Sequence, residues 1–124
     1  MIVNENRLRQ IVDFDSIKFG NIQPTDIDGV LEYHNKAYIL LEFKCGDACL
    51  SQGQSIALTR MVDDLSKVKH AVLFVARHRT PVDKTVDAGS CIVTDYYWHG
   101  EWYEAEVPLR EMMETYIKYM EVVS

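Results

Sequence analysis

The chain has 124 residues, of which 48% are hydrophobic and 26% charged, and its formal net charge is −6. This length and composition are typical of a single globular domain, and no apolar run approaches the roughly 18 residues that a transmembrane helix needs. The acidic balance argues against a protein that coats nucleic acid non-specifically.

The start of the chain and its cysteines indicate a reduced, cytoplasmic setting. The first residues lack the basic and apolar regions of a secretory signal peptide. The chain has 3 cysteines, an odd number, and Cys45 and Cys49 lack a second ligand pair at zinc spacing. We therefore expect free thiols and a cytoplasmic protein.

The first 20 residues are compatible with two local structures. Apolar residues at helical spacing, with Asn4 as N-cap, fit a short helix before Phe14. Residues 11–19 also alternate as a strand would, so the strand remains an alternative. Gly20 then marks a turn, and Pro24 favours extended backbone at the residue before it.

The next stretch predicts a β-hairpin. Its two arms, 27–33 and 37–44, are rich in strand-forming residues and are separated by the polar residues 34–36. In the second arm, strand alternation puts Glu42 and Lys44 on one face and the apolar side chains on the other.

The register of this hairpin decides which carboxylates face each other. A three-residue loop at 34–36 puts Asp28 opposite Glu42, whereas a loop one residue earlier puts Asp26 there. Either register gathers two carboxylates and Lys44 on one patch of the sheet. Two carboxylates this close repel, and a divalent cation removes the conflict. The alternative is a solvent-facing hairpin with ordinary Glu/Lys pairs.

The complete motif resembles the signature of the PD-(D/E)XK nuclease superfamily, most closely its small phage and archaeal Holliday-junction resolvase-like members. The resemblance covers residues 24–78 and rests on Pro24, an aspartate, Gly29 and an apolar strand that ends in Glu42-Phe43-Lys44. One departure is that Pro24 does not directly precede either aspartate. We favour Asp28 over Asp26, because the simpler register selects it and Gly29 lets a ligand approach closely beside it.

The resemblance implies a metal-dependent DNA endonuclease, structure-selective and phage-related, that uses Mg²⁺ or Mn²⁺. The metal ligands that it implies are Asp28, Glu42, the carbonyl of Phe43 and, as the alternative, Asp26. The catalytic residues that it implies are Asp28, Glu42, Lys44, which would orient the attacking water, and Gln54. It further implies an initial helix, DNA as the partner and, for compact members, a homodimer. The alternative is a nuclease-fold binding or regulatory domain that does not cut, which the acidic charge and the lack of a basic stripe favour.

Residues 51–66 have the spacing of a helix, and we expect one stripe of it to face the core. That stripe consists of Gln54, Leu58, Met61, Leu65 and Val68. Ser51-x-x-Gln54 is also a capping box, in which the glutamine side chain returns to the helix start. Gln54 is therefore either a cap or a site residue.

The continuous apolar run between His70 and His78 predicts a strand buried on both faces. Together with the preceding helix it forms a βαβ crossover, so this strand should lie parallel to 37–44. We predict a mixed α/β (α+β) sheet in one domain, 1–124, flanked by helices. Its core would match the αβββαβ, restriction-endonuclease-like core that the resemblance implies, with one strand unlocated.

The remaining residues predict a polar loop, a second hairpin and a final helix. Residues 80–89 read as the loop, and 90–97 and 101–106 as the hairpin arms around His99-Gly100. The five aromatic residues on these arms could stack on unpaired bases or pack a sheet face or an oligomer interface. Pro108 is expected as the first helical residue. The apolar face of that helix should consist of Leu109, Met112, Met113, Tyr116, Ile117 and Met120.

Overall fold

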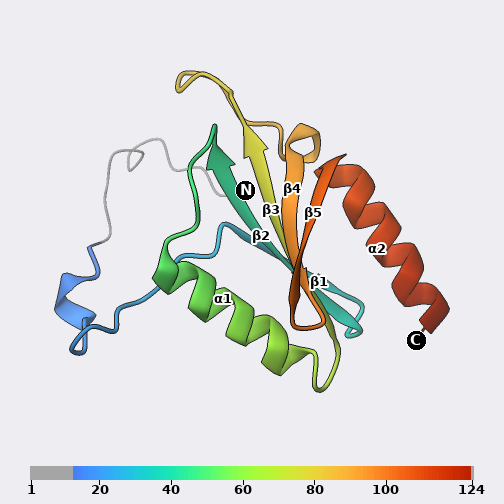
Figure 1. Ribbon diagram of the computed structural model, residues 1–124, viewed down its shortest axis with the longest axis horizontal. Helices are drawn as coiled ribbons and strands as arrows, with labels where there is room; N and C mark the ends of the chain where they lie inside the picture. Colours follow the sequence, from blue (N-terminus) through green and yellow to red (C-terminus); the bar gives the residue numbers. More distant parts are fainter. Residues whose placement is uncertain (1–12, 124) are drawn as a thin grey trace.

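A five-stranded mixed sheet with a helix on each face makes up the computed structural model, which describes residues 13–123 (Figure 1). The strands, in their order across the sheet, are β1 (Gly29–Tyr33), β2 (Ala37–Cys45), β3 (His70–His78), β4 (Ile92–Trp98) and β5 (Glu101–Pro108). The helices are α1 (Gln52–Leu65) and α2 (Leu109–Val123). β2 and β3 are parallel and the other neighbours antiparallel, so the predicted α+β class and mixed sheet are confirmed.

Between residue 13 and β1 the chain contains little regular structure. The expected helix between Asn4 and Phe14 lies outside the described residues. A single 3₁₀ turn at Asp15–Ile17 stands where the alternative strand would have continued. Phe19 and Ile22 pair across the turn predicted at Gly20, whose φ is +64°. No strand within 13–123 pairs with the outer edge of β1, and the sheet instead continues beyond β3. The restriction-endonuclease-like core thus stays a prediction.

The β1–β2 hairpin has the simpler of the two predicted registers. Tyr33 pairs with Ala37 across the three-residue loop 34–36, and Gly29 pairs with Leu41. His34 and Asn35 take positive φ angles of 46° and 59°, which lets the chain reverse over so few residues.

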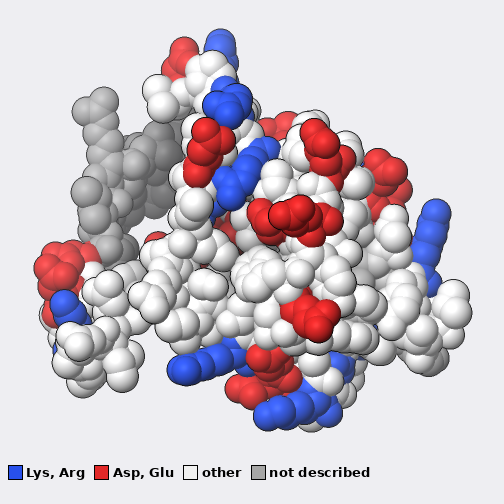
Figure 2. All heavy atoms as spheres, in the orientation of Figure 1, with Lys and Arg blue, Asp and Glu red and all other residues white. Residues whose placement is uncertain are grey.

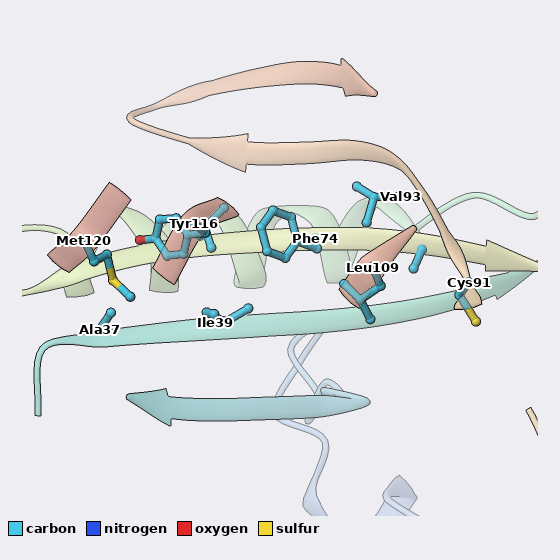
Figure 3. Close-up of a cluster of buried hydrophobic side chains, with 10 residues drawn as sticks. Ala37, Ile39, Phe74, Cys91, Val93, Leu109, Tyr116 and Met120 are labelled. Carbon is cyan, nitrogen blue, oxygen red and sulfur yellow. The ribbon is translucent and has the colours of Figure 1, made fainter. Parts of the chain in front are cut away.

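β3 is the central strand and is buried on both faces, as predicted. On the α2 face lies a core cluster that includes Ile39, Phe74, Leu109, Tyr116 and Met120 (Figure 3). On the α1 face a second cluster includes Leu40, Leu58, Val62, Leu73 and Tyr97. The single apolar run of β3 therefore supplies side chains to two cores on opposite sides of the sheet.

Helix α1 lies where it was predicted, with Ser51 and Ser66 as its caps, but it does not have the predicted stripe. Leu58 and Val62 are its buried residues, whereas Met61 is 40% exposed and Val68 is 78% exposed. Val62 lies one turn after Leu58 and points the same way, while Val68 falls in the turn after the helix end at Leu65. The prediction for Met61 and Val68 was wrong.

The carboxyl-terminal hairpin is confirmed, with His99 and Gly100 as a two-residue loop at positive φ angles of 51° and 78°. The aromatic rings of this hairpin pack on one another and on α2, as in the predicted alternative in which they pack a sheet face. The ring centroids of Tyr96 and Tyr103 are 5.2 Å apart in a stacked pair, and those of Trp98 and Tyr119 of α2 are 5.6 Å apart.

The boundary between this hairpin and α2 differs from the prediction. Pro108 pairs with Ile92 as the last residue of β5, and α2 begins at Leu109. An edge strand tolerates proline because its missing N–H would face away from the ladder. The apolar face predicted for α2 is confirmed, with Leu109, Tyr116 and Met120 buried. In the part of the chain described, no helix is long and apolar enough to cross a membrane.

Candidate active site

Asp28 and Glu42 meet at the open end of the β1–β2 hairpin. Asp28 lies one residue beyond the Gly29–Leu41 pair and therefore opposite Glu42. The Asp28 N–H donates to Oε1 of Glu42 at 3.2 Å, and the Phe43 N–H donates to Oδ2 of Asp28 at 2.8 Å. These reciprocal bonds hold each carboxylate at the backbone of the other strand. The register brings Asp28 and not Asp26 to Glu42.

Glu42 is the buried charged residue of this site, with 1% of its surface exposed. Burial raises the pKa of its carboxyl, because desolvation disfavours the charged form, and the negative charge of Asp28 raises it further. The Asp28 N–H and the positive charge of Lys44 act in the opposite direction but are the smaller effects on this pKa. An ionised Glu42 is therefore energetically costly unless further positive charge reaches it.

A hydrogen bond joins the side chain of Lys44, on β2, to the side chain of Gln54, on α1. The Lys44 ammonium donates to Oε1 of Gln54 at 3.2 Å. The same oxygen accepts the Ser51 N–H at 3.3 Å, while the Gln54 N–H donates to Oγ of Ser51 at 3.1 Å, which completes the predicted capping box. A carbonyl oxygen has two lone pairs, so the two roles considered for Gln54 are compatible.

The other residues of the predicted metal set lie around this centre. Asp26 is exposed and, with Gln54, lines a groove between α1 and the segment before β1. Phe43 contacts Asp28 through its N–H, and a role for its carbonyl stays a prediction. Among residues 13–123, no three His, Cys, Asp or Glu side chains gather at one point. A cation at Asp28 and Glu42 would need main-chain oxygen or water for its remaining ligands.

Arg77 is a neighbour of the site that the sequence analysis did not single out. It pairs in register with Lys44 across the parallel β2–β3 ladder, and its side chain is 24% exposed. Its guanidinium donates to Oγ1 of Thr94 at 3.0 Å, to the carbonyl of Gly46 at 3.1 Å and to the carbonyl of Ala48. Arg77 thereby ties the loop after Lys44 to β4. The parallel register of β2 and β3 was the signal that could have identified it.

No protein-family model matches the chain, and no curated protein or solved structure is significantly similar to it.

Proposed function

We propose that the chain is a metal-dependent nuclease of the PD-(D/E)XK type that hydrolyses phosphodiester bonds in DNA. The observation that supports this most is the burial of Glu42 beside a second carboxylate, with Lys44 next along the same face. Purely structural ion pairs place a basic group within contact of a buried acid. Within residues 13–123 no basic side chain lies within 4.0 Å of the Glu42 carboxylate.

The side chains fit a divalent cation of the Mg²⁺ or Mn²⁺ type. Both carboxylates offer the hard oxygen ligands that these ions prefer, and positive charge would offset the burial of Glu42 and its repulsion by Asp28. Such an ion supplies charge stabilisation at the scissile phosphate and a lower pKa for bound water.

The rest of the site is arranged to position an ammonium. Gln54 is fixed by the helix cap, so the oxygen that accepts from Lys44 is already ordered. An ammonium held this way can orient a water or offset charge that develops on a phosphate, without further ordering during the reaction. Asp28 is fixed in turn by the Phe43 N–H.

Cleavage assays test the proposal. The protein is incubated with branched, single-stranded and duplex DNA in Mg²⁺ or Mn²⁺, with EDTA as a blank. Glu42→Gln keeps the shape of the side chain and should abolish cleavage. The matched control is Glu111→Gln, an exposed carboxylate in the first turn of α2, which should cleave at the wild-type rate. If no substrate is cut with either metal, the nuclease proposal is rejected and the non-cutting binding domain takes its place.

A further inference from the structure

A groove opens beside the candidate site, where the ends of β3 and β4 meet the loop 79–91. Its volume is about 830 Å³. The charged residues that line it are Asp47, Arg77, Arg79, Lys84, Asp87 and Glu106. We call it the β3-end groove. This volume lies in the range of small-ligand sites.

The β3-end groove adjoins the end of β2 that carries Lys44. Lys44 and Arg77 are direct neighbours in the β2–β3 ladder, and the guanidinium of Arg77 reaches the carbonyl of Gly46, two residues after Lys44. Arg79 lies over the same turn: a Cβ on Gly46 would stand 3.4 Å from its Nη1. A strand whose phosphate lies at Lys44 would therefore enter the groove next.

Two cations in the groove are available to phosphates. Lys84 is exposed and forms no ion pair within 4.0 Å in the described part of the chain. Arg79 pairs with Asp47 at 3.5 Å, but both side chains are largely exposed, and such a pair is weak enough for a phosphate to displace it. Of the other two carboxylates in the lining, Asp87 accepts a hydrogen bond from the hydroxyl of Ser90 at 2.5 Å, and Glu106 is exposed.

The β3-end groove is lined by three cations and three carboxylates, whereas the surroundings on the other sides carry an excess of negative charge. Among the residues that the structure describes, the groove along α1 is lined by Asp13, Asp15 and Asp26 and by one cation, Arg60. Acidic side chains also gather over β4 and β5, which lie in the centre of the view in Figure 2. On β5, Glu104 lies outside the β3-end groove and pairs in register with Asp95 of β4. A duplex spanning the site would press its second strand against these carboxylates.

We propose that the substrate of this site is a single DNA strand, or the single-stranded end of a branched DNA, held on one side of the scissile phosphate by the β3-end groove. This rests on the proposed nuclease function and names its substrate class. Lys44, Arg79 and Lys84 would each neutralise about one phosphate, so the salt dependence of binding should be shallow, with a slope of log K against log[salt] of about −2.

Binding is measured without cleavage, by fluorescence anisotropy of a labelled oligodeoxythymidylate in Ca²⁺, against a duplex of equal length. We expect the single strand to bind at least about tenfold more tightly than the duplex at low salt. Equal or tighter binding of the duplex would overturn the proposal.

Two sets of variants locate the contact. Arg79→Ala with Lys84→Ala should make the slope shallower by about 1.4, because each lost phosphate contact on a single strand contributes about 0.7. Lys118→Ala removes an exposed cation on α2, away from the groove, and should change nothing. Glu104→Gln, outside the lining of the groove, should strengthen duplex binding and leave the single strand within about twofold.

These outcomes are separable from the fate of the nuclease proposal. Single-strand preference without any cleavage in Mg²⁺ or Mn²⁺ rejects the nuclease and leaves a strand-binding groove. Cleavage that persists while the Arg79/Lys84 variant binds with an unchanged salt slope rejects the groove and leaves the nuclease. Because both of these side chains are exposed, circular dichroism should show wild-type folding.

Discussion

Replacing Glu42 by Gln should stabilise the metal-free protein, whereas most substitutions at buried positions lower stability. The amide keeps an acceptor for the Asp28 N–H and removes a charge that burial and Asp28 both disfavour. The metal-free variant should therefore unfold at a higher temperature than the metal-free wild type at neutral pH.

Metal should stabilise the wild-type protein far more than Glu42→Gln. A ligand at 100 times its dissociation constant stabilises the folded state by about 2.7 kcal/mol. For a chain of 124 residues this corresponds to a rise of roughly 10 °C in the unfolding temperature. Wild type should show this rise with Mn²⁺, while Glu42→Gln should show almost none.

The pH dependence follows from the raised pKa of Glu42. The folded protein holds the proton more tightly than the unfolded chain, so wild-type stability without metal should fall as pH rises from the ordinary glutamate pKa through the raised one. Thermal melts by circular dichroism between pH 4 and pH 8 measure this, and the contribution should be missing in Glu42→Gln. The reasoning is refuted if the variant is less stable than wild type at every pH, or if Mn²⁺ stabilises both equally.

Five further substitutions test the site and the packing. Asp28→Asn should eliminate DNA cleavage, whereas Asp26→Asn should weaken it modestly; the opposite ranking in a cleavage assay would show that Asp26 is the ligand. Lys44→Ala should lower the single-turnover cleavage rate by orders of magnitude and leave the metal affinity measured by calorimetry nearly unchanged. Tighter metal binding with unchanged cleavage would instead make the lysine structural and favour the non-cutting domain. Leu58→Ala should cost about 2–5 kcal/mol of unfolding free energy in urea titrations, whereas Met61→Ala, on the exposed side of α1, should cost well under half as much.

The local features of the fold were predictable because each rests on a strong short-range signal. The polar residues 34–36 mark the loop of the β1–β2 hairpin, and the position of this loop sets the register. The apolar run of β3 could only be a strand with cover on both sides. These signals also brought Asp28 and Glu42 together correctly.

The errors arose where two local preferences compete or where the contact is distant in sequence. A stripe that passes through Leu58 can continue through Met61 or Val62, and only the position of the sheet decides between them. Proline suits the first turn of a helix and also the end of an edge strand, and pairing with Ile92 decided for the strand at Pro108. Arg77 became visible only when β2 and β3 were aligned, because it lies 33 positions after Lys44.

The shared acceptor on Gln54 makes the order of the site depend on the first turn of α1. Helix ends open and close on timescales of nanoseconds to microseconds, and each opening of this turn would release the hold on the Lys44 ammonium. Over evolution, position 54 is then confined to residues that can both cap a helix and accept from an ammonium. Glutamate meets both demands but adds a third negative charge beside Asp28 and Glu42. A neutral amide is the side chain that serves the helix without changing the charge that the metal site presents.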